Sequence, residues 1–92
     1  NTFRMLQETL TVRNRAGLHT RPAAMLVKLA AKFKCDIYLN RDGYDINAKS
    51  IIGVMTLAAE QGSELILTTD GADEQPALDE LRALFESGFG EL

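Results

Sequence analysis

The sequence contains one histidine, His19, and the residues around it are suited to phosphoryl chemistry. Gly17 lies in the loop before it, and Arg21 and Pro22 follow it at the expected start of a helix. The first turn of a helix offers unpaired backbone N–H groups and the positive end of the helix dipole, which together attract anions. The N–H groups of Thr20 and Arg21, with the Arg21 guanidinium, are therefore candidate ligands for phosphate.

His19 is the candidate nucleophile of this segment. The helix start and Arg21 both disfavour a positive charge on the imidazole, so we expect a neutral, nucleophilic ring near neutral pH. Once the ring carries a phosphoryl group, the same groups stabilise the new negative charge. A lone histidine beside a loop is also a common helix cap, and the residues of this segment alone leave that alternative open.

Other kinds of chemistry find no support in the sequence. Cys35 is the only cysteine and is expected to be a small buried hydrophobe in a strand, so with one histidine no metal site is predicted. The glycine-rich phosphate-binding loop of nucleotide-binding proteins is missing, so we expect neither ATP nor another cofactor to bind. A single cysteine cannot form an intramolecular disulfide, which favours a reducing compartment.

The composition predicts one small domain covering residues 1–92. Hydrophobic residues make up 46% of the chain, enough for a modest core, and the net charge of −3 predicts no binding to nucleic acid. The apolar segments are too short to cross a membrane. Residues 1–5 lack the cationic and apolar regions of a signal peptide, so we expect a cytoplasmic protein without membrane insertion.

Hydrophobic periodicity predicts the elements that position these residues. Alternating apolar and polar residues predict four strands, over residues 6–13, 35–40, 44–48 and 63–69. Helical spacing predicts three helices, over residues 20–33, 51 to about 62, and 74 to about 87.

These elements follow one another in the order βαββαβα, which predicts an α+β fold. Three amphipathic helices can bury their apolar stripes on one face of a four-stranded antiparallel sheet, so we expect an open-faced β-sandwich. Ser50 and Asp73 are the expected N-caps of the second and third helices. An Asp42-Gly43 turn is expected between the second and third strands.

The short second helix can bury one apolar stripe, and its residues leave two interpretations open. Ile51, Val54 and Ala58 form the most natural buried stripe. Ile52 and Met55 are then expected to point away from it. They form either a partly covered edge of the core or an apolar docking patch beside the histidine.

Three segments resemble those of a known family. Residues 17–24, Gly-Leu-His-Thr-Arg-Pro-Ala-Ala, resemble the active-site signature of HPr, the histidine-containing phosphocarrier family of the bacterial phosphotransferase system. Residues 48–55 resemble the regulatory serine region of that family, and Asp-Glu-Gln at 73–75 resembles the opening of its last helix. The similarity extends over nearly the whole chain, and the family's βαββαβα order agrees with the order inferred above.

The resemblance implies a phosphocarrier rather than an enzyme. Enzyme I, itself phosphorylated from phosphoenolpyruvate, would transfer the phosphoryl group to Nδ1 of His19. The group would then pass to the A component of a sugar-specific permease, and Arg21 would stabilise the phosphate. Because a carrier must leave one partner before it meets the next, we expect a monomer with transient interfaces.

The resemblance also implies regulation and docking. In part of the family a dedicated kinase modifies the serine that corresponds to Ser50 and so slows transfer through the histidine. A serine kinase/phosphorylase and a transcription factor are therefore further partners that the resemblance implies. A phosphate there is favourable at a helix N-terminus, yet it adds negative charge to the surface that meets enzyme I. The docking surface implied by the family comprises Ala24, Ile51, Ile52 and Met55.

Three alternatives stay open. The nitrogen-regulatory paralogue of the family keeps the histidine, and residues 84–89 resemble that branch. The catabolite-repression variant lacks the histidine and binds a transcription factor once its serine is phosphorylated, so His19 argues against a purely regulatory binding protein. An unrelated small α+β binding domain would require the match at residues 17–24 to be chance.

Overall fold

The computed structural model describes residues 4–92, and the first three residues, part of the segment considered above for a signal peptide, lie outside the described residues. Its elements are β1 (Leu6–Thr11), α1 (Thr20–Ala30), β2 (Asp36–Arg41), β3 (Tyr44–Asn47), α2 (Ile51–Thr56), β4 (Glu64–Asp70), α3 (Glu74–Glu86) and the 3₁₀ turn η1 (Gly88–Gly90). The βαββαβα order predicted from the sequence is confirmed.

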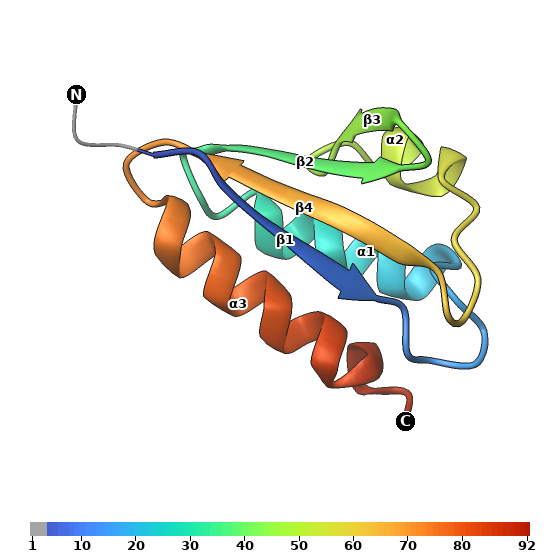
Figure 1. The fold of residues 1–92 in the computed structure, drawn as a ribbon. Coiled ribbons are helices and arrows are strands. Elements are labelled where there is room, and N and C mark those ends of the chain that lie inside the picture. Colours follow the sequence, from blue (N-terminus) through green and yellow to red (C-terminus); the bar gives the residue numbers. More distant parts are fainter. Residues whose placement is uncertain (1–3) are drawn as a thin grey trace.

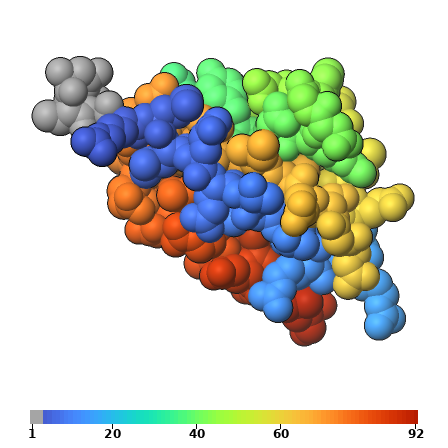
Figure 2. Space-filling view, viewed as in Figure 1, coloured from blue at the N-terminus to red at the C-terminus, as the bar shows by residue number. Residues whose placement is uncertain are grey.

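The four strands form one antiparallel sheet in the order β1-β4-β2-β3. Figure 1 shows α1 and α3 along one face of this sheet and α2 beside β3. Figure 2, drawn from the same side, shows β1 in blue, β4 in orange and the β2–β3 hairpin in green exposed next to one another, with no helix over them. The predicted open-faced β-sandwich is therefore confirmed.

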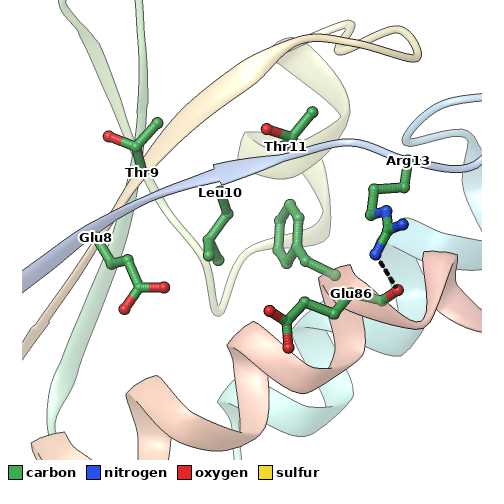
Figure 3. A pocket seen from close by; sticks show the side chains of 7 residues that line it. Glu8, Thr9, Leu10, Thr11, Arg13 and Glu86 are labelled. Atoms are coloured by element: carbon green, nitrogen blue, oxygen red, sulfur yellow. Dashed lines mark hydrogen bonds between the residues drawn. The ribbon is translucent and has the colours of Figure 1, made fainter.

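Alternate residues of each strand face the helices and form the core, as the two-residue period of a strand requires. In Figure 3, Glu8 and Leu10 of β1 point toward α3, whereas Thr9 and Thr11 point away from it. The inward positions of the other strands continue this layer. Leu39 of β2, for example, is paired with Ile46 of β3 on one side and with Leu67 of β4 on the other. Burying these apolar side chains against α1 and α3 stabilises the fold.

Helix α2 ends at Thr56, and the end predicted near Gly62 is wrong. The backbone leaves the helical region at Ala58, which has a φ of 46°. The Arg41 guanidinium of β2 donates hydrogen bonds to the carbonyl oxygens of Leu57 and Ala58, at 2.7 and 2.8 Å. A side chain from the sheet thus satisfies carbonyl groups that a further helical turn would otherwise have used.

The buried stripe predicted for α2 is wrong at two of its three positions. Val54 is buried, but Ile51 is 39% exposed and Ala58 is exposed as well. Because the helix is only six residues long, its buried side is completed by Leu57 directly after it. Ile52 is exposed as predicted, and Ile51 is exposed as well.

Asp73 stands at the N-cap position of α3, but its side chain makes no capping hydrogen bond, so the predicted cap is wrong. Its carboxylate instead accepts hydrogen bonds from the backbone N–H groups of Lys34 and Cys35, both at 2.8 Å. These bonds hold the pKa of the Asp73 carboxyl below its ordinary value, and the bond from Lys34 has the largest effect. Cys35 is buried as expected, and burial raises the pKa of its thiol to about 11.

Candidate functional site

His19 stands at the N-cap position of α1. Its backbone is extended, and its carbonyl oxygen accepts the hydrogen bond of the Ala23 N–H at 3.0 Å, which starts the helix. The imidazole makes no capping hydrogen bond to the helix, and its side chain is 42% exposed. The ring is therefore accessible for chemistry and does not serve as a side-chain cap.

The loop before His19 is held rigidly. The buried Asn14 side chain donates a hydrogen bond to the Gly17 carbonyl at 2.8 Å, and the Leu18 N–H donates to the Ala59 carbonyl at 2.8 Å. Gly17 has a φ of 74°, and a Cβ at this position would lie only 2.5 Å from the Ala59 carbonyl oxygen. Glycine is therefore required here, and the loop fixes the direction in which His19 enters the helix.

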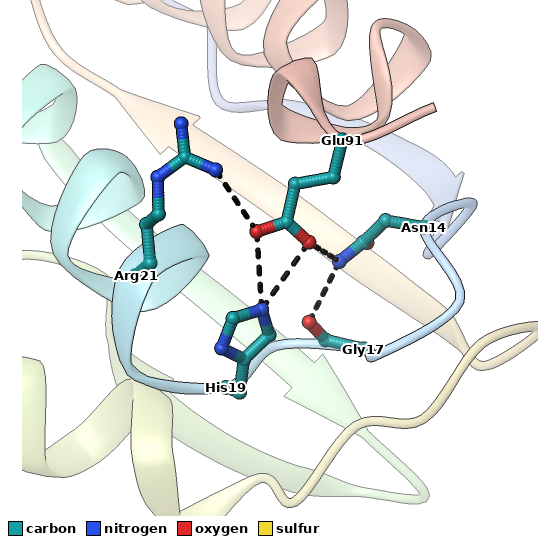
Figure 4. A network of polar contacts seen from close by, with 5 residues as sticks. All are labelled: Asn14, Gly17, His19, Arg21 and Glu91. Carbon is teal, nitrogen blue, oxygen red and sulfur yellow. Dashed lines mark hydrogen bonds and ion pairs between the residues drawn. The ribbon is translucent and has the colours of Figure 1, made fainter.

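A carboxylate that the sequence did not reveal lies against the histidine. The two Glu91 side-chain oxygens lie 3.2 and 3.1 Å from Nε2 of His19, and the Arg21 Nη1 atom donates to the same carboxylate at 3.2 Å. Asn14 adds a hydrogen bond at 2.9 Å (Figure 4). These hydrogen bonds hold the pKa of the Glu91 carboxyl below its ordinary value. The bond from Asn14 has the largest effect, followed by those from His19 and Arg21. Glu91 is thus an ionised acceptor shared by three donors.

Contact with Glu91 selects one form of the neutral imidazole. A carboxylate accepts hydrogen bonds only, so the ring nitrogen that faces it must carry the proton. Nε2 of His19 is that nitrogen, and Nδ1 is left with a free lone pair. In Figure 4 the second ring nitrogen lies on the side of the ring away from Glu91. In this neutral form Nδ1, on the side away from Glu91, is the ring nitrogen without a proton.

The start of α1 supplies the positive groups that the sequence predicted. Intrahelical bonding begins with the Ala23 N–H, so the N–H groups of Thr20 and Arg21 precede it and have no helical acceptor. No acidic residue lies in the first turn. The Arg21 side chain is 65% exposed, which leaves its guanidinium free to exchange Glu91 for another anion.

The last residues of the chain are folded so that Glu91 reaches the site. Phe89 is fully buried with a φ of 56°, and its ring packs edge to face on Phe85 of α3, with the ring centroids 5.0 Å apart. This packing folds the chain back after α3 through the η1 turn. Nothing in the spacing of Asn14, His19 and Glu91 signals their contact, because it depends on how α3 packs under the sheet.

Ser50 and its neighbours lie at the start of α2. The Ser50 side-chain oxygen accepts a hydrogen bond from the Gly53 N–H at 3.1 Å, so its predicted role as N-cap is confirmed. Ile51, Ile52 and Met55 are 39%, 74% and 41% exposed, and we call these three residues the α2 patch. Ala24 of α1 is exposed too, and α1 packs against α2.

Within residues 4–92, no group of three or more His, Cys, Asp or Glu side chains is placed to hold a metal ion. The helices of the same part of the chain are all too short or too polar to cross a bilayer.

Comparison with known proteins identifies the family. The family model for the phosphorylation site of the HPr component of the phosphotransferase system matches residues 6–87. The phosphocarrier protein HPr of Cupriavidus necator is 49% identical over 87 residues, which cover 95% of this chain and 98% of that protein. The HPr-like protein Crh of Bacillus subtilis is 47% identical over 79 residues, covering 86% and 93%. The chain belongs to the HPr family.

Solved HPr structures share the fold. A crystal structure of HPr from Thermoanaerobacter tengcongensis matches with a TM-score of 0.92 at 42% identity, over 95% of this chain and 98% of that one. Another structure of HPr from the same organism, with a TM-score of 0.77 at 45% identity over 87% and 92%, is described as a dimer. As a member of the HPr family, this chain is a phosphocarrier of the phosphotransferase system and not an enzyme.

Proposed function

We propose that His19 accepts a phosphoryl group on Nδ1 from phosphorylated enzyme I, which obtains it from phosphoenolpyruvate, and passes it to the A component of a sugar-specific permease. The observation that carries this proposal is the contact of Nε2 with the Glu91 carboxylate, at 3.1 Å. It keeps the ring proton on Nε2 and the lone pair on Nδ1, beside the start of α1.

The transfer needs no proton to move on the carrier. The Nδ1 lone pair of His19 attacks phosphorus, the bond between phosphorus and the donor breaks, and its electron pair stays with the donor. The phosphorylated ring keeps its Nε2 proton, and the Glu91 carboxylate offsets the positive charge that develops there. Discharge to the next acceptor reverses the same step, so one geometry serves both directions.

The phosphoryl oxygens replace the Glu91 carboxylate as the partner of the Arg21 guanidinium. They accept hydrogen bonds from the N–H groups of Thr20 and Arg21 at the positive end of α1. Arg21 is exposed and is held by one contact to Glu91, at 3.2 Å, so its guanidinium can move onto the phosphate at small cost. The guanidinium fork then binds two phosphate oxygens at once.

The α2 patch and Ala24 form the proposed docking surface for enzyme I and for the A components. Exposed apolar side chains on a helix adjacent to α1 provide a contact area beside the phosphoryl group, and a small area favours rapid release. We propose a monomer on the same reasoning, since each transfer requires the carrier to dissociate. We place it in the cytoplasm because a single cysteine suits a reducing compartment.

Phosphorylation of Ser50 by a serine kinase is the proposed regulation. The side-chain oxygen that would carry the phosphate already faces the Gly53 N–H, so the N-cap position tolerates the added charge. A phosphate there adds nearly two negative charges next to the exposed Ile51 and Ile52, and desolvating it on docking is costly. Transfer through His19 is then slowed without any change in the histidine site.

The direct test uses purified enzyme I with phosphoenolpyruvate and Mg²⁺. Incubation with this chain is expected to give an acid-labile phosphoryl adduct, which is lost in His19→Ala and kept in Ser50→Ala. An adduct that survives His19→Ala, or none at all with active enzyme I, would contradict the carrier role. For Ser50, the kinase and ATP are expected to give an acid-stable adduct that Ser50→Ala abolishes.

A further inference from the structure

The face of the sheet opposite the helices is uncovered by any element of residues 4–92 and takes no part in the proposed phosphoryl transfer. We call the outward-pointing side chains of β1, β4, β2 and β3 the open face. The strand pairings place every second residue of each strand on it. Its charged and large apolar members are Asp36, Tyr38, Asp45, Glu64, Ile66 and Asp70.

The middle of the open face is apolar and aromatic. Tyr38 of β2 and Ile66 of β4, on adjacent strands, are each 40% exposed. A shallow hollow between them is lined as well by Met5, which is 55% exposed, and by Gln7 and Thr68. Large apolar side chains gathered on the uncovered side of a sheet are typical of a contact surface.

The charges of the open face have one sign. It carries four carboxylates, those of Asp36, Asp45, Glu64 and Asp70, and no lysine or arginine. The chain has ten Lys and Arg residues, but the only one within the strands is Arg41, whose guanidinium is bonded to carbonyl groups after α2 on the helix side. The surface therefore creates a negative potential that attracts cationic groups.

Two of these carboxylates lie directly opposite each other. Asp36 of β2 and Asp70 of β4 are partners in the antiparallel register, where like charges repel and destabilise the sheet. None of the ion pairs among residues 4–92 involves either of them. A cationic group of a partner placed between the two would remove this repulsion.

The open face is also ordered before any partner arrives. Asn40 donates to the Asp45 carboxylate at 2.8 Å, and Gln7 donates to the Thr68 hydroxyl at 3.0 Å. These cross-strand hydrogen bonds and the sheet beneath them reduce the entropy that binding has to overcome. A rigid apolar centre with carboxylates around it is complementary to an arginine- or lysine-bearing surface.

We propose that the open face is a second docking surface, which binds a basic region of a partner protein. Lysine or arginine side chains of the partner pair with Asp36 and Asp70, and a guanidinium stacks on the exposed ring of Tyr38. Nucleic acid and anionic membranes are repelled by the same carboxylates, and so is a second copy of this face. The surface shares no residue with the histidine site, so the carrier can be bound here while it exchanges phosphoryl groups.

The test uses a defined probe, the nonapeptide (Lys-Arg-Leu)₃ with blocked ends, titrated into ¹⁵N-labelled protein. Saturable amide shifts are expected in the four strands. The Asp36→Asn/Asp70→Asn variant is expected to bind roughly fivefold more weakly, because each exposed ion pair contributes a fraction of a kcal/mol. Tyr38→Ala is expected to bind more weakly too.

A matched control removes the same charge elsewhere. Glu60→Gln/Glu80→Gln neutralises two exposed carboxylates outside the sheet and is expected to bind within about twofold of the unchanged protein. The proposal is overturned by equal weakening in both double variants, by shifts centred on α1 and α2, or by no saturable binding to the folded protein. Shifts of the strand amides that depend on protein concentration without peptide would identify a second copy as the occupant, and would overturn it as well.

Discussion

Nε2 of His19 lies 3.1 Å from a carboxylate oxygen of Glu91, a residue 72 positions further along the chain. This contact places an anion in a site that otherwise contains the positive groups of a helix start and Arg21. The carboxylate favours the neutral ring with its proton on Nε2, and it also accepts a hydrogen bond from the Arg21 guanidinium. In the proposed transfer, the phosphoryl group would displace this internal anion from the Arg21 guanidinium.

Replacing Glu91 by alanine is expected to change the tautomer of His19. Loss of one hydrogen bond worth about 1 kcal/mol shifts the ratio of the Nε2–H to the Nδ1–H form roughly fivefold toward the latter. Long-range ¹H–¹⁵N correlation spectra of the imidazole, recorded where the ring is neutral, report this ratio directly. Glu86→Ala, an exposed glutamate of α3, serves as the control, and an unchanged ratio in Glu91→Ala would argue against the role of the carboxylate.

Arg21→Lys is expected to slow phosphoryl transfer from enzyme I although the positive charge is kept. The ammonium group cannot form the two-pronged contact of a guanidinium, and losing one charge-assisted hydrogen bond lowers kcat/KM roughly tenfold. Arg15→Lys makes the same exchange at an exposed arginine in the loop before His19 and is expected to leave the rate unchanged. Equal rates for the two variants would show that charge alone suffices.

Ser50 allows stability and docking to be separated. Ser50→Ala removes the capping oxygen that accepts from Gly53, which costs about 1 kcal/mol and lowers Tm by about 4–8 °C, while transfer from enzyme I continues. Ser50→Asp keeps a capping oxygen and so keeps Tm, but its charge is expected to raise KM for enzyme I roughly tenfold. Thermal unfolding and transfer kinetics measure the two effects, and a normal KM in Ser50→Asp would remove the proposed basis of regulation.

The Glu91 contacts also predict a pH dependence of stability. Hydrogen bonds from Asn14, His19 and Arg21 hold the pKa of Glu91 below its ordinary value of 4.5 in the folded protein. The unfolded chain therefore binds this proton more readily, so the stabilisation is present above the ordinary pKa and is lost as the pH falls through the lower, folded value. The difference in Tm between the unchanged protein and Glu91→Gln is expected at neutral pH and should vanish once the pH has fallen below the lowered, folded pKa of Glu91. A difference in Tm that stays constant over this pH range would contradict the role of the ionised Glu91 carboxylate in stability.

The features that the sequence predicted correctly are local ones. His19, Arg21 and the start of α1 lie within one helical turn, so residue types and spacing define their geometry. Ser50 is predictable as an N-cap for the same reason, because it bonds to a backbone group three positions later. Strand alternation and helical stripes likewise depend on neighbouring residues, and together they identify the order of the elements.

The features that the sequence missed depend on contacts between distant segments. Glu91 reaches the histidine only because Phe89 is buried beside α3 and turns the chain back. Arg41 of β2 bonds the carbonyl groups of Leu57 and Ala58, directly after the early end of α2. The Asp73 carboxylate could accept hydrogen bonds from the N–H groups at the start of α3 or from those before β2. It accepts from the Lys34 N–H, before β2, and does not cap α3. In each case a side chain chooses its partner by tertiary packing, which spacing along the chain does not encode.

We propose Nδ1 of His19 as the atom that carries the phosphoryl group. The most direct measurement is ³¹P and ¹⁵N NMR of the protein labelled with ¹⁵N-histidine, recorded during phosphorylation by enzyme I and phosphoenolpyruvate. We expect an acid-labile adduct whose phosphorus is coupled to Nδ1, with the proton still on Nε2. Phosphorus coupled to Nε2, or an adduct at another residue while His19 is unmodified, would contradict this account.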